Sequence, residues 1–132
     1  MIRVRREVYA EMLAHARGGY PLEVCGLLAG KDGEATALYR MTNTDGSGEH
    51  YTMDPREQFD AVRDMRARGM GLAGIYHSHP ETPARPSDED IRLAYTPGVS
   101  YVIISLMDRE APSAGSYRIK DGSAEAEGLE IM

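Results

Sequence analysis

Two histidines separated by one residue stand within residues 74–90, which read GIYHSHPETPARPSDED. The residues just before them predict a strand, and side chains two positions apart on a strand point to the same face. His77 and His79 are therefore expected side by side, with Ser78 facing away. Two imidazoles on one face are natural ligands for zinc, which in catalytic sites usually takes three protein ligands and keeps one position for water.

Asp90 is the candidate third ligand, because the short loop of residues 80–86 and one helical turn can return its carboxylate to the histidines. The stretch from Ser87 to Asp90 also matches a capping box, in which an N-cap serine and an acid three residues later satisfy free N–H groups. Acids in a first turn further suit the helix dipole. The two roles are compatible, since the cap fixes the turn that aims Asp90.

A zinc site also needs a base that takes a proton from bound water. Glu23 has the right chemistry and opens an apolar strand, although a charged residue at such a place is ordinarily a solvated strand end. The pattern alone does not choose Glu23 over Glu49, Glu57 or Glu81. Cys25 would share the face of Glu23, and packing in the core is the preferred interpretation over a nucleophile.

The segments around these residues resemble the JAMM motif of the MPN (JAB/MPN+) metallopeptidase family. That motif is a distant Glu, then His-X-His-Pro, six residues, Ser, two residues and Asp. In this chain Glu23, His77, His79, Ser87 and Asp90 stand at the family spacing. The surroundings, Glu-X-Cys-Gly-Leu-Leu and Ile-Tyr-His-Ser-His-Pro, are typical of small prokaryotic members.

The resemblance implies a role for each matched residue. His77, His79 and Asp90 would bind one Zn²⁺ per chain, with water as the fourth ligand. Glu23 would take the proton of that water and pass it to the leaving amine. Ser87 would hydrogen-bond the oxyanion, a charge that develops only in the transition state. Two histidines and one aspartate suit zinc, but iron or cobalt could also occupy such a site.

Length and charge limit the other functions. The chain has 132 residues, the size of one ordinary domain, and the resemblance implies one MPN (cytidine-deaminase-like) catalytic domain over residues 1–132. A net charge of -6 with scattered basic residues argues against nucleic acid as a partner. No segment resembles a signal peptide or a membrane span, so we expect a cytoplasmic protein without a membrane partner. The sequence leaves a homodimer open.

The hydrophobic pattern predicts an α+β fold with a mixed or mostly antiparallel sheet flanked by helices. Gly18 and Gly19 are expected to end the first helix, and Phe59, Val62 and Met65 to form the apolar face of the second. Helices are predicted over residues 5–17, 55–68 and 87–95. Strands are predicted over residues 2–4, 24–29, 35–41, 71–76, 99–106, 113–119 and 124–131.

The substrate class also follows from the resemblance. Eukaryotic members carry extra loops that grip ubiquitin, for which this short chain has little room, so it looks more like small bacterial relatives that act on ubiquitin-like sulfur-carrier proteins. We therefore expect zinc-dependent hydrolysis of a peptide or isopeptide bond after the carrier's C-terminal Gly-Gly. A non-catalytic MPN-type scaffold is the second hypothesis, although such scaffolds usually lose ligands that this chain keeps. An amidase or DNA-repair-associated relative with another substrate is the third.

Overall fold

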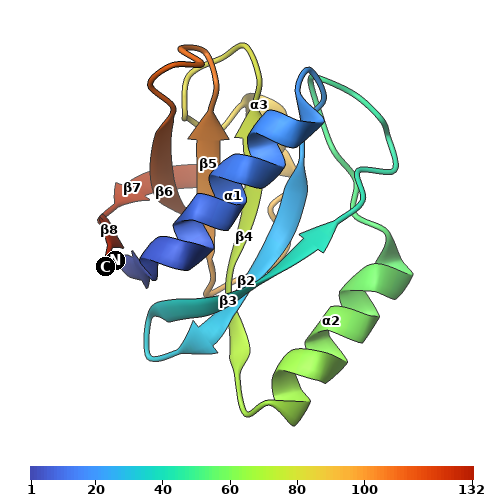
Figure 1. Cartoon of the computed structure of the whole chain (residues 1–132), viewed down its shortest axis with the longest axis vertical. Coiled ribbons are helices and arrows are strands. Elements are labelled where there is room, and N and C mark those ends of the chain that lie inside the picture. Colours follow the sequence, from blue (N-terminus) through green and yellow to red (C-terminus); the bar gives the residue numbers. More distant parts are fainter.

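The computed structural model describes residues 1–132 as eight strands and three helices (Figure 1). The elements in chain order are β1 (Ile2–Val4), α1 (Arg6–Gly19), β2 (Cys25–Lys31), β3 (Glu34–Met41), α2 (Pro55–Ala67), β4 (Gly71–His79), α3 (Asp88–Arg92), β5 (Ser100–Ser105), β6 (Ser113–Lys120), β7 (Ser123–Glu127) and β8 (Leu129–Ile131). The strands form one sheet in the order β7-β6-β5-β4-β2-β3-β1-β8. Parallel and antiparallel pairs occur together, which confirms the predicted α+β class with a mixed sheet.

The middle of the sheet is formed by β4, which pairs antiparallel with β2 and parallel with β5. All six residues of β5 are buried, as its β-branched and apolar sequence predicts for a strand covered on both faces. The register places Cys25 opposite His77, and Ser105 opposite His79. The histidines therefore stand at the end of a rigid central strand.

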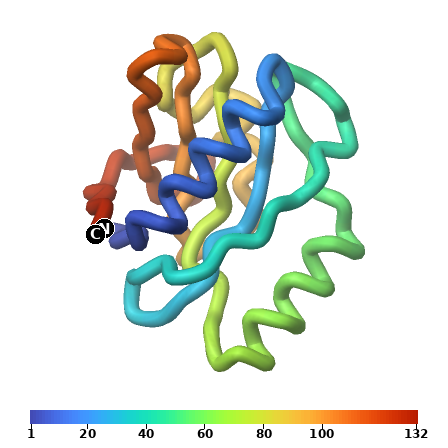
Figure 2. The backbone as a smooth tube through the Cα atoms, viewed as in Figure 1, coloured from blue at the N-terminus to red at the C-terminus, as the bar shows by residue number.

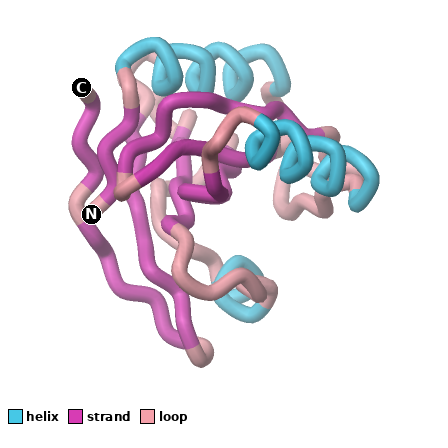
Figure 3. The backbone as a smooth tube through the Cα atoms, turned by 90° about the horizontal axis from the view of Figure 1, so that it is seen from below, coloured by secondary structure: helices cyan, strands magenta, loops and turns pink.

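Helices cover both faces of the curved sheet, as Figures 2 and 3 show. On one face α1 buries Val8, Met12 and Ala16, in a cluster that includes Leu28 and Tyr76 of the sheet. On the other face α2 buries Ala61 and Met65, in a cluster with Cys25, Leu27 and Ala29. Because alternate strand residues face opposite ways, the side of Tyr76 is packed by α1, and the histidines lie on the side of α2 and α3.

The first helix does not end at Arg17, as the sequence predicted, but continues through Gly18 and Gly19. Gly19 is needed for packing, because a Cβ atom there would lie 2.3 Å from Cγ1 of Val24. The helix stops at Tyr20, which has an extended backbone (ψ 133°) and precedes Pro21. A residue before proline is forced out of the helical region, and this signal determines the end of the helix.

The predicted apolar face of the second helix was wrong at Phe59, whose side chain is 63% exposed. Met65 is buried as predicted, and Ala61, one turn before it, faces the sheet in place of Phe59. The Phe59 ring lies on the surface against Arg63, whose guanidinium carbon is 5.7 Å from the ring centroid. This contact stays accessible to solvent.

The third helix and the last strand are shorter than predicted. Instead of residues 87–95, α3 covers Asp88–Arg92, and the chain leaves the helix at Leu93, whose backbone (φ -95°, ψ 10°) is no longer helical. The predicted strand over residues 124–131 is divided at Gly128, with β7 antiparallel to β6 and β8 parallel to β1. None of the helices is long and apolar enough to cross a membrane.

Candidate metal centre

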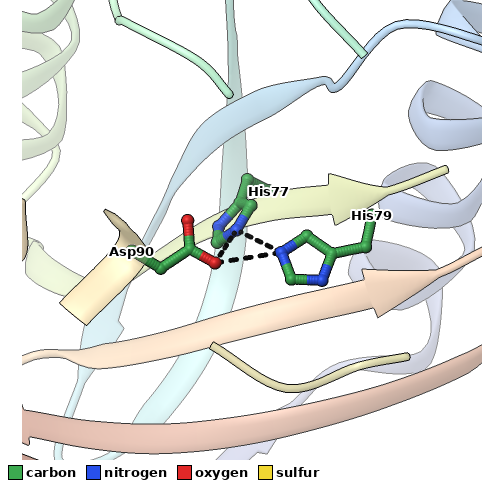
Figure 4. A group of neighbouring side chains, drawn as sticks. All are labelled: His77, His79 and Asp90. Carbon is green, nitrogen blue, oxygen red and sulfur yellow. Dashed lines mark hydrogen bonds and ion pairs between the residues drawn. The ribbon is translucent and has the colours of Figure 1, made fainter. Parts of the chain in front are cut away.

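His77, His79 and Asp90 converge at the end of β4 (Figure 4). The Nε2 atoms of the two histidines are 3.1 Å apart. Oδ2 of Asp90 lies 3.2 Å from Nε2 of His77 and 3.0 Å from Nε2 of His79. Two nitrogens and one carboxylate oxygen are thus directed at one point.

The spacing of these donors fits a zinc ion, as the sequence predicted. Ligand atoms bonded to one tetrahedral zinc at about 2.1 Å lie about 3.4 Å apart, close to the separations in this cluster. The donor set, two imidazole nitrogens and one carboxylate oxygen, is also of the kind that leaves a fourth position for water. Both histidines are almost completely buried, so their orientation is fixed by packing.

His79 is held by a second contact, in which its Nδ1–H donates to the carbonyl oxygen of Pro83 over 2.8 Å. A carbonyl oxygen only accepts, so Nδ1 carries a proton, and Nε2 is the nitrogen that faces Asp90 and is left to bind a metal. Pro83 belongs to the proline-rich loop between β4 and α3. The rigid loop therefore orients a ligand as well as connecting the two elements.

Apart from the contact of its Nε2 atom with Asp90, His77 is oriented by packing. Its ring lies against the ring of Tyr51, with the centroids 4.7 Å apart and the planes inclined by 31°. Its Nδ1 atom is buried without a hydrogen-bond partner. Burial lowers the pKa of His77, against the opposing effect of Asp90, and a neutral imidazole is the form that binds metals.

Asp90 is positioned by the cap of α3. The N–H of Ser87 donates to Oδ2 of Asp90 over 2.9 Å, and the N–H of Asp90 donates to Oγ of Ser87 over 3.0 Å. Burial disfavours the charge of Asp90, yet the hydrogen bonds from His77 and His79 hold the pKa of the carboxyl far below its usual range. The capping and ligand interpretations of this segment are therefore both satisfied by one carboxylate.

Glu23 lies on the same face as the histidines. Cys25 pairs with His77, and both backbone groups of Val24 bond Ser78, so the antiparallel register continues with Glu23 beside His79. The Glu23 side chain is buried, and its Oε1 has no hydrogen-bond partner. Burial raises the pKa of Glu23 to about 8, and the positive potential of His79 opposes this shift.

The structure distinguishes Glu23 from the other three glutamates. Both carboxylate oxygens of Glu57 accept hydrogen bonds from Thr42. Glu81 accepts a short hydrogen bond from the hydroxyl of Tyr20, and Glu49 is exposed. Only Glu23 combines burial with an unpaired carboxylate oxygen.

Ser87 and Cys25 lie in contrasting surroundings. Ser87 is exposed at the start of α3, where its hydroxyl oxygen accepts from the Asp90 N–H and its own proton is free to donate. Cys25 is fully buried, and burial raises the pKa of its thiol to about 12. A thiol that stays protonated is a poor nucleophile, which favours the packing role.

Two residues near the centre were not identified from the sequence. Tyr51 stacks on His77, and Asn43 donates from Nδ2 to the carbonyl oxygens of Glu23, Ser47 and His50. The Asn/Asp/Gly/Ser-rich stretch of residues 42–49 predicted a loop, but nothing in it indicated which side chain organises that loop. Tyr51 and Asn43 are identified by their contacts with segments distant in the sequence, and only the fold reveals these contacts.

An α+β sheet with a histidine pair at the end of its central strand defines a class of metal-site enzymes, and comparison with known proteins identifies the family. The family model described as prokaryotic homologs of the JAB domain matches residues 5–120 of the chain. The chain belongs to this family, which confirms the predicted resemblance and the MPN fold class.

Relatives cover nearly the whole chain. The CysO-cysteine peptidase of Mycobacterium tuberculosis (strain H37Rv) is 37% identical over 131 residues, which are 98% of this chain and 90% of that protein. The desampylase of Haloferax volcanii is 38% identical over 102 residues, covering 71% of this chain and 73% of that protein. The solution structure of protein DSY2949 from Desulfitobacterium hafniense has a TM-score of 0.92 and 47% identity, covering 100% of this chain and 93% of that chain. The predicted enzyme class, a hydrolase, is confirmed by the named peptidases among these relatives.

Proposed function

We propose that this chain is a zinc metallopeptidase that cleaves the bond after the C-terminal Gly-Gly of a ubiquitin-like sulfur-carrier protein. His77, His79 and Asp90 hold one zinc ion, Glu23 is the general base, and residues 1–132 act as one catalytic domain. The observation that carries this proposal is the buried, unpaired carboxylate oxygen of Glu23 on the same sheet face as a converging His-His-Asp set.

A bound zinc ion polarises a carbonyl group and lowers the pKa of a water molecule toward about 7. The chain supplies the proton transfer. Glu23, with a pKa raised to about 8 by burial, can both accept a proton and release it near neutral pH. A cation nearby shifts this pKa downward, toward the range in which a carboxylate is an effective base at neutral pH. Glu23 then delivers the same proton to the departing amine.

Ser87 is proposed to stabilise the developing oxyanion. Its hydroxyl oxygen already accepts from Asp90 N–H, so the hydroxyl proton is directed away from the cap and can be donated to the reacting group. Because α3 fixes both Ser87 and Asp90, the oxyanion donor and one metal ligand keep a constant relationship.

The carrier substrate is supported by the relatives. One is named a CysO-cysteine peptidase and another a desampylase, and the first aligns with almost this entire chain. A diglycine tail is thin and flexible enough to enter a site whose ligands are buried. The cytoplasmic location expected from the sequence stays a prediction, and the question of a homodimer stays open.

The test is hydrolysis of a sulfur-carrier protein that carries one residue after its Gly-Gly, followed by mass spectrometry. Zinc-loaded wild type, a chelated sample and Glu23→Gln are compared, with zinc content measured for each. Loss of the added residue in the zinc-loaded wild type alone supports the reaction and the base together. An uncleaved carrier, with one zinc bound per chain, contradicts the proposed substrate, and full activity of Glu23→Gln contradicts the proposed base.

A further inference from the structure

A cavity of about 400 Å³ adjoins the metal centre, and the ligand Asp90 forms part of its wall. The cavity lies between the segment Tyr51–Met53, α3 and the chain that follows α3. Cavities of this size accommodate a small organic group or one large side chain. Of the five residues assigned to the reaction, only Asp90 lines the cavity.

The wall of the cavity is mainly apolar and aromatic. Met53, Ile75 and Leu93 contribute aliphatic surface, and Tyr51 and Tyr101 contribute rings. The Tyr101 hydroxyl accepts from Thr96 N–H over 3.1 Å and donates to the Thr96 carbonyl over 3.2 Å, which fixes the loop after α3 against β5. These two bonds therefore hold the part of the wall that the loop after α3 contributes.

The charges of the wall have one sign. Its ionisable side chains are the carboxylates of Glu89 and Asp90 and three tyrosines, and it contains no lysine, arginine or histidine. An occupant whose side chain carries a carboxylate would be desolvated without a lysine, arginine or histidine in the wall to pair with it, which is costly. An uncharged apolar side chain replaces water at the aliphatic and aromatic surface and gains free energy by burial.

The reaction itself shows which side of the substrate this cavity serves. The two residues on the acyl side of the proposed scissile bond are glycines, which have no side chain to place in a pocket. Because the wall of the cavity includes the metal ligand Asp90, the cavity lies too close to the scissile bond to bind residues further along the carrier. The group that remains is the first residue on the leaving side.

We propose that this cavity is the leaving-side specificity pocket, and that it selects an α-linked residue with a large uncharged apolar or aromatic side chain after the Gly-Gly. This inference rests on the proposed function and adds the chemistry of the released residue. An ε-linked lysine places only a narrow methylene stem in the same space. A small residue such as alanine leaves most of the cavity empty and loses the burial that the wall offers.

The first experiment compares carriers that end in Gly-Gly followed by Phe, Leu, Ala or Asp, and a carrier joined to the ε-amine of lysine, with the zinc-loaded enzyme. The expected order of kcat/KM is Phe and Leu first, at least about 10-fold above Ala, with Asp slowest. Equal rates for Phe and Ala, or the highest rate for the ε-linked lysine, would overturn the proposal.

The second experiment changes the wall at Leu93, which is 45% exposed and can be replaced without opening the core. Leu93→Ala is expected to reduce the ratio of kcat/KM for Phe over Ala to about 3 or less. Leu93→Arg should raise kcat/KM for the Asp carrier, because it supplies the missing cation. Arg92→Ala is the matched control, since Arg92 is the neighbouring exposed residue of α3 and does not line the cavity. An unchanged ratio in Leu93→Ala would contradict the pocket.

A binding measurement separates failure of this inference from failure of the proposed function. The chain contains no tryptophan, so the fluorescence of a Gly-Gly-Trp peptide reports its own burial. Zinc-loaded Glu23→Gln should bind this peptide, and the further change Leu93→Ala should weaken binding about 10-fold. Binding of this kind with no carrier cleaved would retain the pocket and remove the proposed reaction. If wild type cleaves the peptide but Leu93→Ala does not weaken its binding, the proposed reaction would be retained and the pocket removed.

Discussion

Asn43 donates a hydrogen bond from Nδ2 to the carbonyl oxygen of Glu23 over 3.0 Å. The Glu23 N–H in turn donates to the carbonyl oxygen of Ser47 over 2.8 Å. Both backbone groups of the proposed base are thus fixed by one loop, while its Oε1 stays unpaired. The same loop continues to Tyr51, which packs on His77, so Asn43 connects the positions of the base and a metal ligand.

Replacement of Asn43 should therefore reduce turnover without removing zinc. In Asn43→Ala the carbonyl oxygens of Glu23 and His50 lose their donor. We expect kcat to fall about 10-fold or more with little change in KM, because a small displacement of a catalytic group is costly. Steady-state kinetics and zinc content measure the two effects separately.

Asn43→Asp provides the more specific comparison, since it keeps the size of the side chain and the oxygen that accepts from Thr52 N–H but loses the Nδ2 donor. Its kcat should be reduced as in Asn43→Ala. Glu49→Ala is the control, because Glu49 lies in the same loop with an exposed side chain that makes no hydrogen bond. Wild-type turnover in both Asn43 variants would show that this contact does not position the base.

Zinc should stabilise the fold as well as support catalysis. The three proposed ligands converge only in the native state, so zinc at about 100-fold its Kd is expected to add about 2.7 kcal/mol to the free energy of unfolding. Chelation is expected to lower Tm by several degrees, and zinc should restore it. His77→Ala should abolish this zinc-dependent shift, whereas His50→Ala, which changes an exposed histidine outside the cluster, should retain it. Differential scanning calorimetry with and without zinc makes the comparison, and a Tm independent of zinc in the wild type would argue against a metal site.

The two roles of Ser87 can be separated by substitution. Ser87→Ala removes both the cap acceptor and the proposed oxyanion donor, and loss of an N-cap costs about 1 kcal/mol. Ser87→Asp keeps an acceptor for the Asp90 N–H but has no hydroxyl proton at neutral pH. We expect Ser87→Ala to lose stability and activity, and Ser87→Asp to recover Tm while activity stays about 100-fold below wild type. Activity that follows Tm in both variants would indicate a capping role alone.

The parts of the site that could be predicted are those determined by the spacing of residues within a short segment. His77 and His79 share a face because strand side chains alternate, and Asp90 is aimed by a cap that its own four-residue segment encodes. The central strand β5 was evident from its continuous apolar sequence. These features depend on neighbours along the chain, which sequence patterns represent well.

The parts that could not be predicted depend on contacts between distant segments. Asn43 reaches back 20 positions to Glu23, and Tyr51 reaches forward to a strand that begins after α2. Phe59 was placed on the apolar face because it stands at helical spacing from Val62 and Met65, but only the packing of α2 decides which of its faces meets the sheet. The division of the last strand at Gly128 likewise depends on distant pairing, because β7 pairs with β6 at one edge of the sheet and β8 pairs with β1 at the other. The Met1 side chain lies against this glycine.

Glu127 gives the fold an acid-sensitive contact far from the metal centre. Its carboxylate accepts hydrogen bonds from Ser116, Arg118 and the amino group of Met1. Burial raises the pKa of this group, but the hydrogen bonds from Ser100, Ser116, the N-terminus and Arg118 outweigh burial and lower the pKa to about 2. The pKa in the folded state is therefore below the ordinary value of about 4.3 for an unfolded chain.

The sign of the effect follows from this difference. The unfolded chain binds more protons at Glu127, so the contribution of this residue is complete above about pH 5 and is lost as the pH falls toward 2. Glu127→Gln should be less stable than wild type at about pH 7, and the difference in free energy of unfolding should shrink as the pH falls through this window. Glu125→Gln, an exposed position on the same strand, should show no such convergence. Urea unfolding of the three proteins across this pH range tests the prediction, and a constant difference between wild type and Glu127→Gln would contradict it.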